Sequence, residues 1–161
     1  MALNPDFVGR SYPAGSSYLV GREKIREFAS AIGDTNPVFH DVEAARALGY
    51  ADLVAPPTFP VILSLKASGA VVRDPDLGLD YTRVVHGEQR FAYARPIVAG
   101  DRLVAELHVD GVRAMGGGAM ITTRQEIFAL PAGASAGTAD DAGREPVATA
   151  TSSLLVRGEG Q

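Results

Sequence analysis

The segment GDTNPVFHD, residues 33–41, combines two aspartates, an asparagine and one of the three histidines of the chain. A carboxylate and an imidazole that lie close together can deliver and accept protons, so Asp34 and His40 are a candidate general acid and base. The same residue types also build turns, because aspartate and asparagine side chains bond to nearby backbone N–H groups. Asn36 precedes Pro37 and is therefore pushed out of the helical region. We favour the turn interpretation for Asp34 and a surface position for His40.

The two other histidines lie in β-rich segments. His86, in VVHGEQRF, stands near the start of an expected strand. It is a further candidate for proton transfer, although a lone strand histidine more often only satisfies a hydrogen bond. His108 alternates with Leu107 and Val109, which predicts an exposed side chain. The histidine spacing repeats no metal-ligand pattern and the chain has no cysteine, so we expect no metal site and no thiol chemistry.

The composition limits the class of protein. The chain has 161 residues, of which 46% are hydrophobic and 21% charged, and its formal net charge is −4. These values are typical of a globular protein with room for one core, so we expect a single domain over residues 1–161. The 15 lysines and arginines are scattered, which argues against nucleic-acid binding. We find no signal peptide and no apolar run long enough to cross a bilayer, so we expect no membrane partner and a cytoplasmic location.

Helices must position the first candidate residues. In REKIREFASAI, residues 22–32, apolar side chains recur at helical spacing, and Gly33 follows as a stop. A second short helix is expected after Asp41 as its N-cap. Residues 58–72, TFPVILSLKASGAVV, contain a single charged residue, and such an apolar helix is normally buried. We expect its serines and Gly69 to allow close packing rather than to act in catalysis.

The second half of the chain is predicted to form strands. β-Branched residues with partial alternation dominate four segments, and the triple glycine at residues 116–118 predicts a hairpin turn. The polar stretch 131–146 is expected to be a mobile loop within the domain, because one strand follows it. Consecutive antiparallel strands with one open face need a cover, which the apolar helix supplies, so the predicted class is α+β. The expected strands are residues 17–20, 83–98, 102–115, 119–130 and 146–157.

Two segments resemble the MaoC-like dehydratases and hydratases of the hot-dog fold. They are residues 22–59, REKIREFASAIGDTNPVFHDVEAARALGYADLVAPPTF, and residues 86–103, HGEQRFAYARPIVAGDRL. The resemblance is closest to the non-catalytic partner subunits of actinobacterial (3R)-hydroxyacyl-ACP dehydratase, with a FAS1-type dehydratase-like domain. It implies a curved antiparallel sheet of about five strands wrapped round a long central helix at about 58–72. It also implies dimers as the working unit, acyl-CoA or acyl-ACP thioesters as substrates, and no cofactor.

Dehydration of a 3-hydroxyacyl thioester needs three kinds of group. A base takes the proton beside the carbonyl, an acid protonates the leaving hydroxyl, and hydrogen-bond donors stabilise the carbonyl oxygen. Catalytic members of the resembled family carry Asp-x-Asn-Pro-x-His and, further along, Ala-His-Gly. Here Phe39 stands in the place of the first histidine. If the local backbone is extended, the one-residue offset turns His40 to the opposite face.

The second motif differs as well. Ala55, Pro56 and Pro57 stand where Ala-His-Gly is expected, and proline has no N–H to offer to an oxyanion. Thr58 could still donate its own N–H at the helix start. We therefore expect this chain to lack the usual catalytic pair. The candidate substrate-binding residues are Asn36, Phe39, Pro57 and Thr58.

Three functions stay open. The first is a subunit that pairs with a catalytic hot-dog subunit and positions the acyl chain of a (3R)-3-hydroxyacyl thioester in fatty-acid synthesis or elongation. The second is an autonomous homodimeric enoyl-CoA hydratase in which Asp34 acts with His40 or His86. The third is a homodimer that binds acyl thioesters without turnover. Four arginines could meet a coenzyme A phosphate or an acidic carrier protein, or lie on a solvated strand edge: Arg83, Arg90, Arg95 and Arg102.

Overall fold

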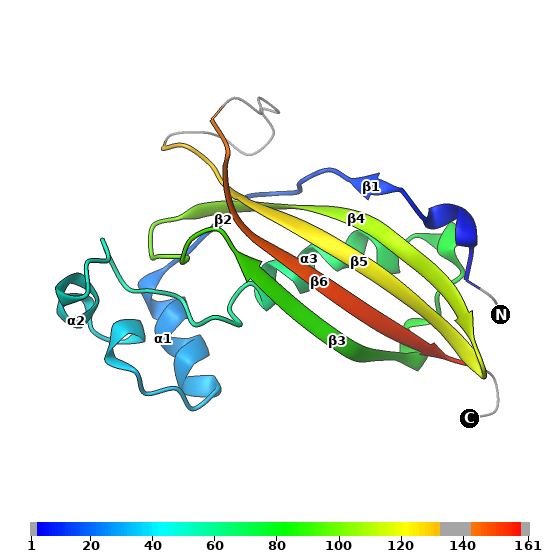
Figure 1. Cartoon of the computed structure of the whole chain (residues 1–161), viewed down its shortest axis with the longest axis horizontal. Coiled ribbons are helices and arrows are strands. Elements are labelled where there is room, and N and C mark those ends of the chain that lie inside the picture. Colours follow the sequence, from blue (N-terminus) through cyan, green and yellow to red (C-terminus); the bar gives the residue numbers. More distant parts are fainter. Residues whose placement is uncertain (1–2, 133–142, 159–161) are drawn as a thin grey trace.

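The computed structural model describes residues 3–132 and 143–158. The first half contains the helical segments and two short strands, and four long strands form the second half (Figure 1). The helical segments are η1 (Pro5–Phe7), α1 (Arg22–Ala31), η2 (Pro37–Phe39), α2 (Val42–Ala47), α3 (Val61–Val72), η3 (Pro75–Leu77) and η4 (Tyr81–Arg83). The strands are β1 (Ser11–Tyr12), β2 (Tyr18–Leu19), β3 (Val84–Tyr93), β4 (Arg102–Met115), β5 (Gly118–Ala129) and β6 (Glu145–Arg157).

The strands form one antiparallel sheet in the order β1-β4-β5-β6-β3, with β2 also paired to β4. α3 runs along one face of the sheet (Figure 1), and side chains of β5 alternate between buried and half-buried. This arrangement confirms the α+β hot-dog fold. The described ranges contain six strands rather than about five. The additional strand, β1, pairs with β4 through only Ser11 and Tyr12 and carries no pattern that the sequence alone reveals.

α3 is the central helix that the apolar segment predicts, but it begins at Val61 rather than at residue 58. Pro60 occupies its N-cap, and residues 57–60 form turns before it. Proline is tolerated here because the first N–H groups of a helix have no internal partner. The buried residues of α3 are Leu63, Ser64, Ser68 and Val71.

α1, η2 and α2 lie beyond one end of the sheet (Figure 1). Gly33 follows α1 with a φ of 72°, the left-handed conformation of a helix stop, as predicted. Asp41 caps α2 as predicted, because its side chain accepts a hydrogen bond from the Glu43 N–H at 2.9 Å. These caps fix the two ends of the segment that carries the candidate acid and base.

Two apolar clusters form the core. One includes Phe39, Phe59 and Ile127 and extends to α1. The second includes Ile121 and Leu154 and extends to η1. Along α3, β5 and β6, five buried polar side chains stand between members of the two clusters. We call them the polar belt: Ser64, Ser68, Thr123, Gln125 and Ser152.

The structure describes only part of the loop expected at residues 131–146. β6 begins at Glu145, so the strand starts earlier than expected and includes Pro146. A register shift beside Phe128 accommodates this proline, since strands tolerate proline at such irregularities. Residues 133–142 lie outside the described ranges, so the mobility of the loop stays a prediction. None of the described helices combines the length and apolar character needed to cross a membrane.

Candidate functional site

The candidate acid–base segment forms a 3-10 turn rather than extended backbone. The Asp34 carboxylate accepts a hydrogen bond from the Asn36 N–H at 3.0 Å, and the Asn36 side chain accepts one from the Val38 N–H at 3.2 Å. Both side chains therefore act as turn residues, in agreement with the turn interpretation of Asp34. A substrate contact of Asn36 stays a prediction, since the amide oxygen already caps η2.

Phe39 and His40 occupy different environments. Phe39 is 7% exposed and belongs to the apolar cluster near α1. His40 is half-buried; its Nε2 lies 2.7 Å from the Asp34 carbonyl oxygen, and its own carbonyl accepts from Arg26 Nε at 2.9 Å. His40 lies just before α2, as expected, and is partly exposed, with its ring bonded to the turn. In a 3-10 turn, a one-residue offset rotates a side chain by about a third of a turn instead of placing it on the opposite face.

The contact with the Asp34 carbonyl limits what His40 can do. A carbonyl oxygen only accepts hydrogen bonds, so Nε2 must carry the proton and Nδ1 is the remaining basic nitrogen. The Asp34 carboxylate bonds to the turn, and in the described ranges no hydrogen bond joins it to the His40 ring. The structure thus brings the two candidate residues together through the backbone but does not pair their side chains.

Residues 55–58 form the second candidate motif, between α2 and α3. The Tyr93 hydroxyl donates to the Pro57 carbonyl oxygen at 2.7 Å. Burial raises the pKa of Tyr93, which keeps this donor protonated. Pro57 and Thr58 are exposed, and the Thr58 N–H donates to no group within the part of the chain that the structure describes. The Thr58 N–H is therefore available to a ligand, and its role as a hydrogen-bond donor stays a prediction.

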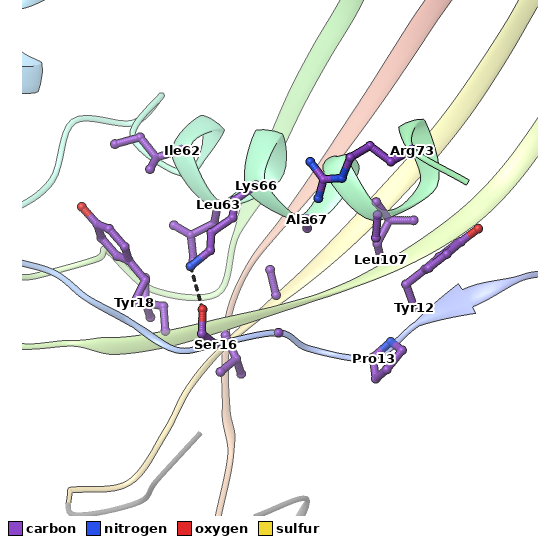
Figure 2. A pocket seen from close by; sticks show the side chains of 15 residues that line it. Tyr12, Pro13, Ser16, Tyr18, Ile62, Leu63, Lys66, Ala67, Arg73 and Leu107 are labelled. Atoms are coloured by element: carbon purple, nitrogen blue, oxygen red, sulfur yellow. Dashed lines mark hydrogen bonds between the residues drawn. The ribbon is translucent and has the colours of Figure 1, made fainter. Parts of the chain in front are cut away.

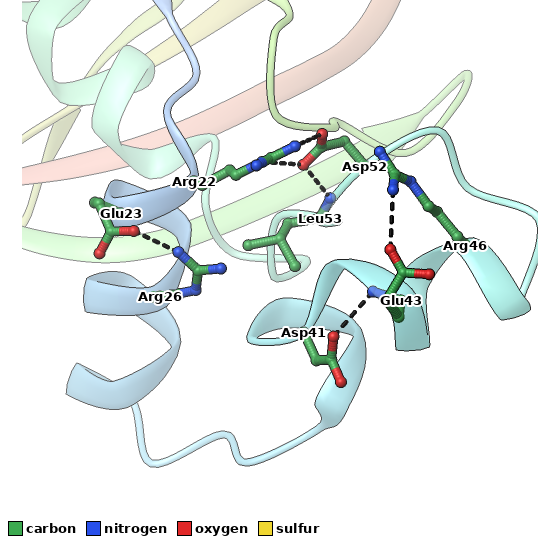
Figure 3. Close-up of polar contacts among 8 residues, drawn as sticks. All are labelled: Arg22, Glu23, Arg26, Asp41, Glu43, Arg46, Asp52 and Leu53. Carbon is green, nitrogen blue, oxygen red and sulfur yellow. Dashed lines mark hydrogen bonds and ion pairs between the residues drawn. The ribbon is translucent and has the colours of Figure 1, made fainter.

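A bidentate ion pair holds the loop that leads to this motif (Figure 3). Arg22 Nε and Nη2 donate to the two carboxylate oxygens of Asp52 at 2.8 and 2.6 Å, and the Leu53 N–H donates to the same carboxylate at 2.8 Å. The hydrogen bond from Arg22 holds the pKa of Asp52 at about 2, below its ordinary value of 3.8. Leu53 is fully buried, so the pair fixes the loop where it enters the core.

Asp52→Asn should lower the free energy of unfolding by about 1 kcal/mol at neutral pH, a small effect because Arg22 is half exposed. The folded pKa of Asp52 lies below 3.8, so its contribution is complete above that pH and is lost as the pH falls toward about 2. The stability difference between wild type and Asp52→Asn should therefore close in this window, as measured by urea unfolding at several pH values. A difference that widens on acidification would contradict the assignment.

A cavity of about 690 Å³ opens between α3, β3 and β6; we call it the α3–β3 cavity. Ser68 and Ser152 of the polar belt reach its wall, and so does the exposed His86. The structure therefore places His86, but not the acid–base segment, at this cavity. The apolar part of its wall is formed by Leu65, Val72, Val84 and Leu154.

A second groove, of about 160 Å³, lies on another face of α3, against β4 and residues 12–18 (Figure 2). Lys66 Nζ donates to Ser16 Oγ at 2.9 Å across this groove. Arg73 lies toward the far end of α3 and also borders the α3–β3 cavity. Two cationic side chains therefore border a small groove whose floor is apolar.

The arginines expected to meet coenzyme A or a carrier protein already have partners. Arg95 donates to Asp101 and to Glu145 at 2.8 Å, and these hydrogen bonds raise its pKa further. Arg95 thus ties the end of β3 to the starts of β4 and β6. A role of these arginines in ligand binding stays a prediction. Each of the other three arginines also has a polar partner: Arg90 bonds Glu88, Arg83 lies beside Asp80, and Arg102 bonds Ser17.

Glu106, His108 and Glu126 bring one donor atom each within 4.8 Å of one another. His108 is half-buried rather than exposed as predicted, and its Nε2 lies 3.5 Å from a Glu126 carboxylate oxygen. Arg124 and Arg144 already form ion pairs with the two glutamates. Because arginines already occupy both glutamates, we assign no metal here. Sequence spacing misses this cluster because it spans two strands.

Comparison with known sequences agrees with this fold. Residues 6–129 match the family model described as "FAS1-like, dehydratase domain region". A UPF0336 protein of Streptomyces avermitilis is 52% identical over 157 residues, which cover 98% of this chain and 97% of the relative. A UPF0336 protein of Saccharopolyspora erythraea is 52% identical over 158 residues, which cover 98% of this chain and 94% of the relative.

Solved structures show the same architecture. A chain of the C-terminally truncated HadBC (3R-hydroxyacyl-ACP dehydratase) complex from Mycobacterium tuberculosis is 33% identical, with a TM-score of 0.77 over 95% of this chain and 99% of that chain. A MaoC-like dehydratase is 31% identical, with a TM-score of 0.79 over 95% of this chain and 43% of that chain. The antiparallel sheet round α3 and the family match over residues 6–129 show that this chain belongs to the FAS1-like dehydratase-region family of MaoC-like hot-dog proteins.

Proposed function

We propose that the chain is the partner subunit of a (3R)-3-hydroxyacyl-thioester dehydratase of fatty-acid synthesis or elongation. One observation carries the proposal: Phe39, which stands where catalytic relatives have a histidine, is packed in the core. A buried phenyl ring transfers no proton, and Pro57 has no N–H for an oxyanion. The chain would therefore bind and position the acyl group while a second subunit supplies the acid–base pair.

The free edge of β3 supports a partner of the same fold. β3 stands at the end of the strand order and pairs, within the described ranges, only with β6. Such an edge presents unpaired N–H and C=O groups that can extend the sheet into another subunit. Val85 and Tyr93 of β3 are 37% and 38% exposed, and Leu65 of α3 is 56% exposed. A partner strand would cover these side chains. The related HadBC structure is itself described as a complex.

The α3–β3 cavity is the proposed place for the acyl chain. Its volume is about 690 Å³ and much of its wall is apolar. Burial of each methylene group in such a wall contributes about 0.8 kcal/mol to binding. Because the cavity lies beside β3, a partner subunit at this edge would help to close it over the ligand.

An autonomous hydratase is the second candidate, and one observation favours it. His86 borders the α3–β3 cavity. In this alternative His86 would act as the base.

Co-expression separates the candidates. The chain is purified alone and together with a hot-dog subunit that has an intact Asp-x-Asn-Pro-x-His, and hydration of crotonyl-CoA is followed by loss of enoyl absorbance. The chain alone should be at least about a hundredfold less active than the complex, because both the base and an oxyanion donor are missing. Val85→Asp, on β3, should prevent assembly. Leu48→Asp is the control, since Leu48 is 69% exposed after α2 and lies off the β3 edge.

Other outcomes identify the alternatives. Activity of the chain alone that disappears in His86→Ala would establish the autonomous hydratase and overturn the proposal. A homodimer that binds decanoyl-CoA but neither turns over nor assembles with the catalytic subunit would identify a non-catalytic binder of acyl thioesters.

A further inference from the structure

The polar belt continues to the surface through Gln89. Ser64 Oγ donates to Gln125 Oε1 at 2.9 Å and lies 3.3 Å from Ser152 Oγ. Ser152 Oγ donates to Gln89 Oε1 at 2.8 Å, and the same oxygen lies 3.1 Å from His86 Nε2. Hydrogen bonds therefore link Ser152 of the polar belt, through Gln89, to the exposed imidazole at the α3–β3 cavity.

The donors and acceptors in the outer part of this chain are fixed. Gln89 Nε2 donates to the Thr151 carbonyl oxygen at 3.2 Å, so turning the amide round would bring two acceptors together. Gln89 Oε1 is therefore an acceptor for both Ser152 and His86. His86 must donate through Nε2–H, which leaves Nδ1 of the neutral ring as an acceptor.

Ser68 supplies a complementary donor on the same cavity wall. The residue is 8% exposed, and within the described ranges its Oγ has one hydrogen-bond contact, to Gln125 Nε2 at 3.4 Å. The hydroxyl accepts in that contact, so its own hydrogen is available to a ligand. Arg73 and Tyr81 add polar atoms only at the exposed rim of the cavity.

A plain hydrocarbon chain would leave these groups without partners. Methylene groups packed against His86 and Ser68 would displace water from both, and a buried polar group without a partner is unfavourable. A hydroxyl group is at once a donor and an acceptor, so it can donate to the imidazole Nδ1 and accept from the serine hydroxyl. The wall is thus complementary to an oxygen-bearing acyl chain.

We propose that His86 and Ser68 form a recognition site for a hydroxyl group, and that this subunit selects hydroxylated acyl thioesters over plain alkanoyl thioesters. This specificity rests on the acyl-binding function proposed above. Because proton transfer would occur in the other subunit, the recognised hydroxyl lies on the chain beyond C3. His86 is then a specificity residue that Gln89 and Ser152 hold in one tautomer.

Binding of matched thioesters to the purified chain, and to its complex with the catalytic subunit, tests this site. The probes are decanoyl-CoA and decanoyl-CoA esters with one hydroxyl group beyond C3, which contain neither the 3-hydroxyl nor the double bond that a dehydratase converts. By calorimetry, at least one hydroxylated probe should bind about tenfold more tightly than decanoyl-CoA. In ¹⁵N spectra the same probe, but not decanoyl-CoA, should shift the Nδ1 signal of His86.

Two serine variants give the comparison. Ser68→Ala should abolish the preference for the hydroxylated probe without weakening decanoyl-CoA binding, whereas Ser153→Ala, at a half-buried position outside the belt, should keep it. Equal affinity for all probes would overturn the recognition site and leave acyl binding intact. A preference that survives both Ser68→Ala and His86→Ala would also overturn it. Failure of every probe to bind would overturn the acyl-binding function itself.

Discussion

Replacement of Phe39 by alanine is expected to lower the free energy of unfolding by about 3–5 kcal/mol, the loss typical of a truncated core phenylalanine. Phe39 is 7% exposed and belongs to the same apolar cluster as Ile25 and Phe59. η2 is also tied to the following loop, because the Val54 N–H donates to the Val38 carbonyl oxygen at 3.2 Å. The neighbours are therefore poorly able to collapse into the cavity that the variant creates.

His40→Ala is the matched variant at the adjacent position. It removes one hydrogen bond to a half-buried turn, so the expected loss is about 1 kcal/mol. Urea unfolding of both variants gives the comparison. The two free energies can be compared only if the unfolding free energy falls with urea concentration at the same slope in both variants. A larger loss for His40→Ala than for Phe39→Ala would mean that the histidine stabilises the core and that the phenylalanine is free to meet a ligand. That result would remove the main support for a partner subunit.

Most of the secondary structure can be predicted from residues that are close together in the sequence. Gly33 and Asp41 predict the end of α1 and the start of α2, because helix stops and caps act on neighbouring backbone groups. The strand expected to continue to residue 98 ends at Tyr93, since Arg95 turns away to bind Asp101, just before β4, and Glu145 of β6. The two residues of β1 have no local signal at all, because only pairing with β4 makes them a strand.

The geometry of the candidate site is harder to predict from the sequence, because its contacts join distant parts of the chain. The loop before α3 depends on an ion pair between Asp52 and Arg22, which are 30 positions apart. The position of His40 depends on a turn geometry that the offset alone does not reveal. For the polar belt a signal does exist: Gln125 and Ser152 occupy inward positions of alternating strands, where apolar residues are expected. A polar residue in such a position indicates a buried network or a site.

Gln125→Leu is expected to lower the free energy of unfolding by about 2–4 kcal/mol, because it leaves buried hydroxyls without partners. Gln125 is fully buried, and its amide bonds to Ser64 and to Thr123, both at 2.9 Å. Leucine has a similar bulk, so the loss would reflect the missing hydrogen bonds more than a cavity. Thr122→Val, at a half-buried, outward-facing position three residues earlier in β5, is the control and should change stability by less than about 0.5 kcal/mol.

Addition of Ser64→Ala to Gln125→Leu tests whether the belt is one network. Removal of both partners of a buried hydrogen bond is less harmful than removal of one, so the double variant should be as stable as Gln125→Leu or about 1 kcal/mol more stable. Losses that simply add would mean that the two side chains stabilise the protein independently. The belt would then not act as one network, and the position of Ser68 at the cavity wall would depend only on its own contact with Gln125 Nε2.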